Sequence, residues 1–168
     1  FTGEAAGDNF GYSVSSAGDV NGDGYRDVIV GAIDNDAGGS DAGRAYIYFG
    51  GSSMNNVADL IFTGEAAGDN FGYSASSAGD LTGDGYSDVI VGAIDNDAGG
   101  SDVGRAYIYF GGSSMNNAAD IIMTGEAAFD GFGVSVSSAG DVNGDGYSDV
   151  IVGAYGNDAG GTIAGRAY

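Results

Sequence analysis

Oxygen-bearing side chains recur at alternate positions of one nine-residue segment, residues 19–27, with the sequence DVNGDGYRD. Asp, Asn and Asp stand at positions one, three and five, Gly stands at position six, and a further Asp stands at position nine. A hard cation such as Ca²⁺ takes about six to eight oxygen ligands, and alternate side chains that turn toward one point can supply them. The chain has no His and no Cys, which excludes His-ligated zinc, thiolate chemistry and Ser-His-Asp catalysis.

The segment occurs three times at a fixed spacing, at residues 19–27, 80–88 and 141–149. Four side chains and the backbone carbonyl at position seven would coordinate the ion, and water would complete its shell. One Ca²⁺ per repeat, three in all, is therefore expected. The predicted ligands are Asp19, Asn21, Asp23, Tyr25 and Asp27 in the first copy, Asp80, Thr82, Asp84, Tyr86 and Asp88 in the second, and Asp141, Asn143, Asp145, Tyr147 and Asp149 in the third.

The segment begins like an EF-hand loop but departs from one at position twelve, where Val30 replaces the bidentate Glu. The alternative is that Asp-Gly and Asn-Gly only make turns. Three copies in a chain of formal charge −20 favour the cation, and three Ca²⁺ would change that charge to −14. The ion is expected to be structural and coupled to folding. Thr82 replaces the Asn of the other copies, and its shorter side chain predicts that the second site is the weakest.

The loops belong to a repeat of 61 residues, which is the spacing between Asp19 and Asp80. β-branched and aromatic residues fill four short runs in each unit, and Gly, Asn, Asp and Ser separate them. Four antiparallel strands per repeat predict an all-β fold of β-propeller blades, whereas a β-solenoid would have shorter coils. The predicted strands of the first unit are residues 11–16, 27–32, 44–49 and 58–63. The predicted units are residues 1–61, 62–122 and 123–168, the last incomplete, giving about 2.75 blades.

Charge and hydropathy exclude two classes of partner. With 24 acidic residues against four Arg and no Lys, the surface would repel nucleic acid. No apolar stretch reaches the roughly 18 residues of a membrane-spanning helix. Neither an initiator Met nor a signal peptide is present, which favours a mature product or a piece of something longer.

Three further elements recur in order in the repeats. The first is Phe10-Gly11, Phe71-Gly72 and Phe132-Gly133; the second is Gly31-Ala32-Ile33, Gly92-Ala93-Ile94 and Gly153-Ala154-Tyr155; the third is residues 43–48, GRAYIY. These elements resemble the FG-GAP repeat family, whose units build the propeller of integrin α subunits and many bacterial surface proteins, although Ile or Tyr replaces the family's Pro in the second element. The resemblance implies calcium-braced blades and a role in adhesion or ligand binding outside the cell. Complete propellers of this family usually have seven blades, and three cannot close a ring.

Other residues have a structural interpretation that we prefer to a functional one. An ion pair with Glu4 or Asp41 is expected for Arg44, and likewise for Arg105 and Arg166, rather than a ligand-binding rim. Residues 34–41 are acidic without regular spacing, which favours a solvated loop over a second cation site. Tyr46 and Tyr48 are expected to pack between strands or blades rather than to stack on sugars.

These observations predict a non-enzymatic, extracellular or cell-surface module that binds a protein or glycan ligand. It would be an oligomer or part of a longer chain. One alternative is a structural subunit whose copies stack blade on blade into a filament or sheath, because an unclosed repeat exposes edges that seek partners. A second alternative is an accessory domain of a larger secreted hydrolase.

Overall fold

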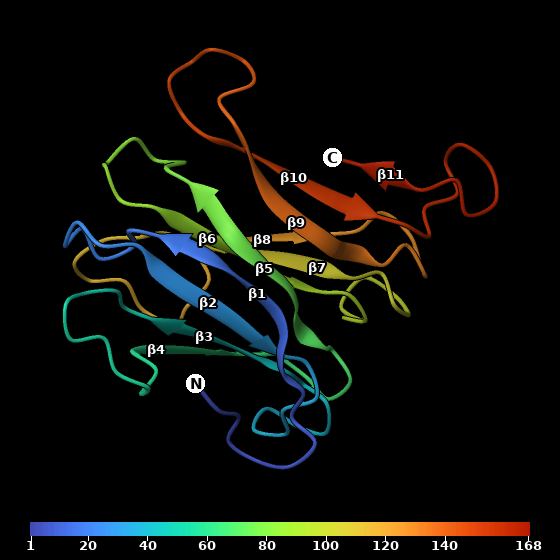
Figure 1. The fold of residues 1–168 in the computed structure, drawn as a ribbon. Helices are drawn as coiled ribbons and strands as arrows, with labels where there is room; N and C mark the ends of the chain where they lie inside the picture. Colours follow the sequence, from blue (N-terminus) through green and yellow to red (C-terminus); the bar gives the residue numbers. More distant parts are fainter.

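The computed structural model describes all residues from 1 to 168 and contains three antiparallel sheets and no helix. Each sheet is built from one repeat, with its strands in sequence order (Figure 1). The predicted all-β fold of propeller-type blades is confirmed, and the third blade has three strands. The strands are β1 (Phe10–Gly18), β2 (Asp27–Ala32), β3 (Arg44–Tyr48) and β4 (Leu60–Thr63); β5 (Phe71–Gly79), β6 (Asp88–Ala93), β7 (Arg105–Tyr109) and β8 (Ile121–Thr124); and β9 (Phe132–Gly140), β10 (Asp149–Ala154) and β11 (Arg166–Ala167).

The second strand of each blade lies in the middle of its sheet and holds the register. In the first blade, Val30 of β2 is opposite Val14 of β1 on one side and Tyr46 of β3 on the other. A bulge after Phe10 and another before Gly18 bend β1, as bulged strands do. The first strand therefore runs longer than predicted, whereas the fourth begins two residues later, at Leu60.

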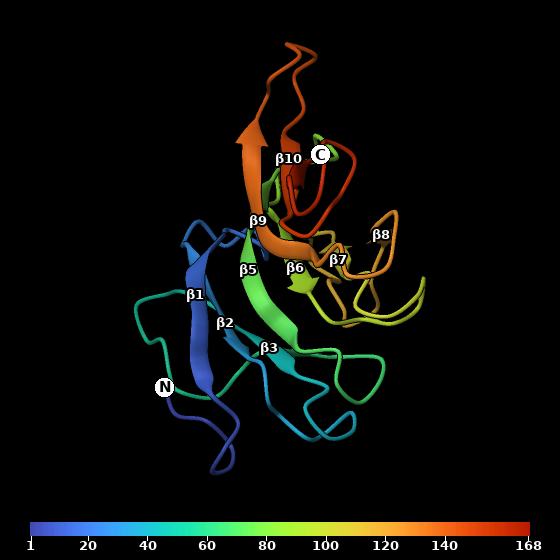
Figure 2. The same ribbon diagram turned by 90° about the vertical axis from the view of Figure 1, so that its right-hand side faces the viewer.

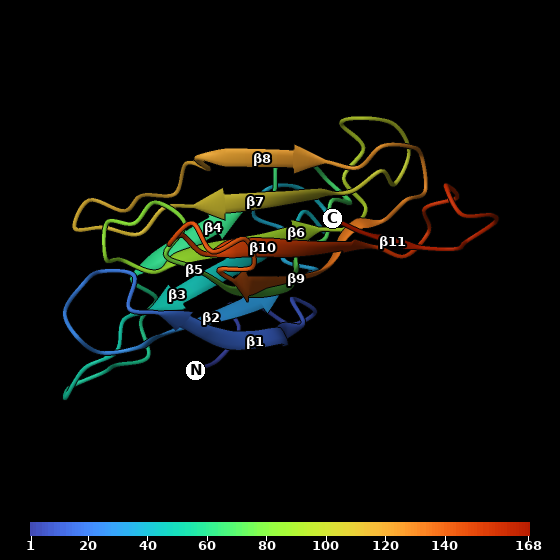
Figure 3. The ribbon, with the colours of Figure 1, turned by 90° about the horizontal axis from the view of Figure 1, so that it is seen from above.

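The blades stack face to face, and the hydrophobic core lies between them. The innermost strands β1, β5 and β9 lie side by side (Figure 2), and β8 and β1 lie at opposite margins of the molecule (Figure 3). Ile47 and Phe62 of the first blade share one buried cluster with Val91 and Tyr107 of the second. A second cluster joins the second and third blades. Each blade therefore depends on its neighbour to bury one face, as expected for stacked repeats.

Glycine lets successive blades approach at one point of this stack. Ser13 donates a hydrogen bond of 2.7 Å to the carbonyl oxygen of Gly72 in the next blade, and Ser74 repeats it with Gly133. A Cβ atom on Gly31 would overlap the Gly72 carbonyl oxygen. The residue at this place in β2 must therefore have no side chain.

Ion pairs tie the segment before each blade to its third strand. Arg44 Nη1 lies 2.7 Å from Glu4 Oε2, and the two other repeats form the same pair at 2.7 and 2.8 Å. The predicted pairing of Arg44 is confirmed, with Glu4 as its partner. The Tyr prediction is confirmed as well, because Tyr46 and Tyr48 are buried in a cluster with Val30 and Ala32. No helix in the structure has the length and apolar character to cross a membrane.

Candidate metal-binding loops

The three Asp-rich segments form the loops between the first and second strands of the three blades. They follow one another along the same end of the stack, as the blue, green and orange loops of Figure 1 show. The repeat therefore places three copies of one oxygen-rich loop in a row.

The carboxylate at position one organises each loop. Asp19 Oδ1 accepts the backbone amides of Gly22 at 2.7 Å and Asp23 at 3.1 Å, and Oδ2 accepts that of Gly24 at 2.9 Å. Asp80 and Asp141 form the same three bonds. Gly22 and Gly24 have φ of 75° and 87°, a left-handed conformation that favours glycine.

Positions three and five lie beside position one. Asn21 Oδ1 accepts the Asp23 amide at 3.0 Å, and its Nδ2 donates to Asp23 Oδ2 at 3.1 Å. In the second loop Thr82 forms neither bond, and Asp84 keeps only its contacts to Asp80 and the Tyr86 amide. Among the bonds made within each loop, the second copy thus has the fewest of the three.

The carboxylate at position nine is turned to the base of the loop. Asp27 is 1% exposed and accepts the amides of Val20 at 2.8 Å and Gly50 at 2.7 Å. Asp88 is buried in the same way, with Leu81 and Gly111 as donors. Burial raises the pKa of both carboxyl groups, because desolvation disfavours the charged form.

The donor set fits a hard cation by chemistry, although no three carboxylates are gathered around one point. Each loop offers oxygen donors from Asp, Asn or Thr and no nitrogen or sulfur ligand, which is the set that Ca²⁺ prefers. At position one, Asp19 Oδ1 accepts two amides, whereas Oδ2 accepts one and keeps a second lone pair for a cation. A bound cation would therefore be coordinated by oxygen atoms that already lie close together in the loop.

A serine that the sequence pattern did not single out joins each of the first two loops to the next blade. Ser87 Oγ accepts the Asp19 amide at 3.2 Å, and the Ser87 amide donates to the Asp19 carbonyl at 2.9 Å. Ser148 does the same for Asp80. Tyr86 packs on Gly22 of the preceding loop. Consecutive loops are therefore in direct contact through these hydrogen bonds and this packing.

Three segments of the chain, each running from the Phe-Gly pair through the Asp loop to the third strand, match the FG-GAP repeat: residues 10–48, 71–109 and 132–168. The chain belongs to the FG-GAP repeat family.

The chain is also similar to integrin alpha subunits. It is 36% identical over 171 residues to integrin alpha-5 of Xenopus laevis, covering 94% of this chain and 16% of that protein. It is 36% identical over 174 residues to integrin alpha-PS2 of Drosophila melanogaster, covering 94% of this chain and 12% of that protein. It is 34% identical over 166 residues to integrin alpha-8 of Homo sapiens, covering 93% of this chain and 15% of that protein. The chain thus spans well under a fifth of the length of these relatives.

The first two FG-GAP repeats here carry a second acidic loop, at residues 34–41 and 95–102. Asp36 Oδ1 accepts the Asp41 amide at 3.0 Å, and the buried Asn35 donates to Asp8 at 2.9 Å. The loop's polar groups thus cap its own turn, in the manner of Asx turns.

Acidification is expected to stabilise these FG-GAP blades in the absence of calcium. Burial is the main cause that raises the pKa of Asp69 and of Asp95 in the folded chain. A carboxyl group whose folded pKa lies above its unfolded value binds its proton first in the folded state, so stability rises as pH falls through that window. In chelator, the melting temperature should therefore rise as the pH is lowered from neutral toward about 3.9, the pKa of an unfolded Asp. A melting temperature that falls steadily over this range would contradict the assignment.

Proposed function

We propose that this chain is a calcium-braced segment of a β-propeller that acts outside the cell as an adhesion or ligand-binding module, with a protein or glycan ligand and no enzymatic activity. The observation that carries the proposal is the threefold recurrence of one oxygen-donor loop at one end of stacked blades. The similarity of this chain to integrin alpha subunits supports the adhesive role. Extracellular modules use calcium sites with Kd values of about 10⁻⁴ to 10⁻³ M, which suits loops as open to solvent as these.

Calcium would be held by the side-chain oxygens at positions one, three, five and nine, which are carboxylate, amide or, at Thr82, hydroxyl oxygens, with the carbonyl at position seven. When bound, it would neutralise the loop carboxylates and fix the first hairpin of the blade. Hydrogen bonds within the chain would then extend this ordering from the loop to the neighbouring blade. Ser87 and Ser148 connect the first and second loops to the blades that follow them, so ions bound in these loops would stiffen the contacts between blades.

The second loop is expected to bind calcium most weakly, because the Thr82 hydroxyl is shorter than the Asn amide and makes no bond to Asp84. Calorimetric titration of the chain should show three sites with one weaker than the others. Thr82→Asn should raise the weak site to the level of the other two, and Asn21→Thr is the matched control that should create a second weak site. Three equal sites in the original chain would contradict this ranking, and the absence of binding at millimolar calcium would contradict the proposed function.

A structural subunit that stacks blade on blade is the second candidate, favoured by the apolar faces at the two ends of the stack. Val14 on the first blade is 67% exposed, whereas its counterpart Ala75 is buried against the first blade. Ile151 on the third blade is 45% exposed. Negative-stain microscopy separates the two functions: discrete particles or rings support the adhesion module, and continuous threads support the filament.

A further inference from the structure

Tyr12 of β1 and Tyr73 of β5 form the one contact between two tyrosine rings in the chain. Their ring centroids lie 5.1 Å apart, and the ring planes meet at 52°. Every other contact between aromatic rings joins a Phe to a Tyr. The two tyrosines belong to the first and second blades, whose innermost strands lie side by side (Figure 2). The pair therefore bridges two blades.

The backbone on both sides of the pair fixes the two rings in place. The pairing of β1 with β2 is interrupted between Phe10 and Ser13, and Tyr12 lies in this bulge. Tyr73 lies in the equivalent bulge of β5, and bulges re-aim a side chain. Ser13, which follows Tyr12, donates a hydrogen bond of 2.7 Å to the carbonyl oxygen of the residue before Tyr73. The contact between the rings is thus built into the approach of the two strands.

The hydroxyl ends of the two rings converge. An interaction with the Tyr12 hydroxyl, together with burial, raises the pKa of the Tyr73 phenol to about 12, so the two hydroxyl groups lie near each other. The ring carbons beside the hydroxyl groups are the atoms that join when two tyrosines couple. A direct bond between them would shorten the distance between the centroids by less than the length of one C–C bond, about 1.5 Å. Tyr12 is 50% exposed, so an oxidant in solution can reach the pair.

The composition of the chain restricts covalent cross-links to this kind. The chain contains no Cys and no Lys, which excludes disulfides and lysine isopeptide bonds. Val134 stands in the third repeat where the first two have Tyr12 and Tyr73, so the contact between tyrosine rings does not recur between the second and third blades. Coupling of two tyrosines within one molecule is therefore expected at a single place.

We propose that Tyr12 and Tyr73 are a modification site at which hydrogen peroxide and a haem peroxidase join the first two blades by a dityrosine bond. Each phenol loses one electron and one proton, and the two phenoxyl radicals form a bond between ring carbons ortho to their oxygens. The hydrogen atom on each of these carbons then moves to the oxygen, which restores both phenols. The two electrons and two protons that were released reduce one hydrogen peroxide to two waters.

The bond would close a covalent loop between residues that are 61 positions apart. A cross-link of this length restricts the unfolded chain far more than the folded one, in which the rings are already in contact. It would therefore brace the first two blades without a disulfide. This inference does not depend on calcium or on an adhesive ligand.

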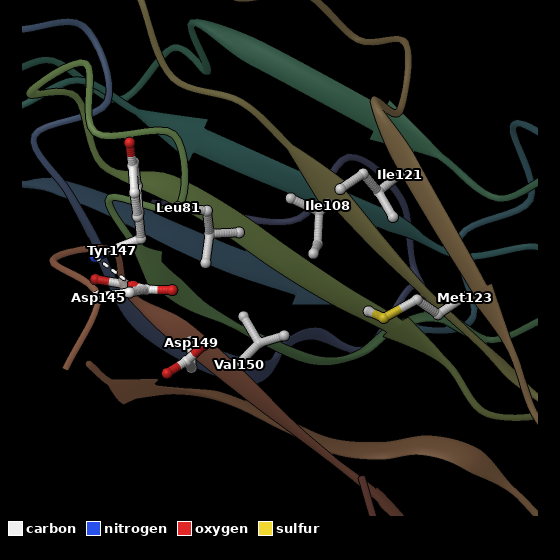
Figure 4. Close-up of a pocket in the computed structure, with 9 residues that line it drawn as sticks. Leu81, Ile108, Ile121, Met123, Asp145, Tyr147, Asp149 and Val150 are labelled. Carbon is white, nitrogen blue, oxygen red and sulfur yellow. Dashed lines mark hydrogen bonds between the residues drawn. The ribbon is translucent and has the colours of Figure 1, made fainter. Parts of the chain in front are cut away.

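Tyr147 provides a matched control because it is 48% exposed and thus as accessible to an oxidant as Tyr12. It lies beside Leu81 and Asp145 at an open groove between the second and third blades (Figure 4). No other aromatic residue lines this groove, and the Tyr147 ring packs on Gly83. Tyr147 therefore has no tyrosine ring to couple with in the same molecule.

Treatment of the dilute 168-residue chain with peroxidase and hydrogen peroxide tests the site. The intact mass of the monomer should fall by two hydrogen atoms, and dityrosine fluorescence should appear. Digestion after Arg should release residues 1–26 linked to residues 45–105, and tandem mass spectrometry should place the link at Tyr12 and Tyr73. The melting temperature of the cross-linked monomer should rise by about 10 °C.

Variants that keep the ring and remove only the hydroxyl group locate the reaction. Tyr12→Phe and Tyr73→Phe should each abolish dityrosine in the monomer and the rise in melting temperature, whereas Tyr147→Phe should leave both unchanged. Circular dichroism before treatment verifies that all three variants fold. The proposal would be overturned if dityrosine were absent or found only in dimers, if Tyr12→Phe and Tyr147→Phe gave equal yields, or if the cross-linked chain melted at the same temperature as the untreated one.

Discussion

Replacing Gly92 by Ala is expected to lower the free energy of unfolding by about 3 kcal/mol, the upper part of the range for overpacking. A Cβ atom at Gly92 would overlap the carbonyl oxygen of Gly133, which belongs to the backbone of the next blade. Ser74 also donates its hydrogen bond to that oxygen, at 2.7 Å. The clash can be relieved only by moving two blades apart, which would open the core between them.

Gly153→Ala is the matched control, because Gly153 occupies the same place in β10 of the third blade and no backbone atom of another strand lies close to its Cβ position. A Cβ atom there meets only side-chain atoms, chiefly of Ser135. Its cost should stay within about 1 kcal/mol, since Ala is otherwise better than Gly inside a strand. Urea unfolding of both variants measures the difference. Equal destabilisation would show that the close approach between blades does not set the requirement for glycine.

Replacing Asp88 by Ala should destabilise the chain by about 2 to 4 kcal/mol even in chelator, because two partly buried amides would lose their acceptor. Leu81 and Gly111 donate to this carboxylate at 2.7 and 2.8 Å. Asp88 is itself fully buried. The effect is thus separate from any role of Asp88 as a metal ligand.

Asp149→Ala is the internal control for that effect. Asp149 accepts one amide, at 2.9 Å, and lies beside the open groove. Its replacement should cost about 1 kcal/mol, the net value of a single hydrogen bond. Thermal or urea unfolding in chelator gives both values. If the two variants were equally destabilised, Asp88 would not brace the base of its loop.

The strands and loops could be predicted from the sequence because their signals are local. The Val-Ile-Val run of β2 and the Gly and Asp residues of the 19–27 loop depend on neighbours within a few positions. The role of Asp27 could not be predicted in the same way. Its spacing suits a cation ligand, yet in the structure its side chain accepts the amide of Gly50, 23 residues further along the chain.

Contacts between blades could not be predicted from the sequence either. The two bonds between Ser87 and Asp19 join residues 68 positions apart, and no local pattern marks that serine as a partner of the loop. The one available signal was the repeat itself, because Ser148 occupies the same position in the third unit.

Thermal unfolding of the chain in chelator and then at increasing calcium concentration tests most directly whether the Asp-rich loops hold metal ions that brace the blades. The melting temperature should be lowest in chelator and should climb with calcium as the ion binds the folded chain in preference to the unfolded one. The same melting temperature in chelator and in millimolar calcium would show that the loops are turns closed by their own amides, and would contradict the account.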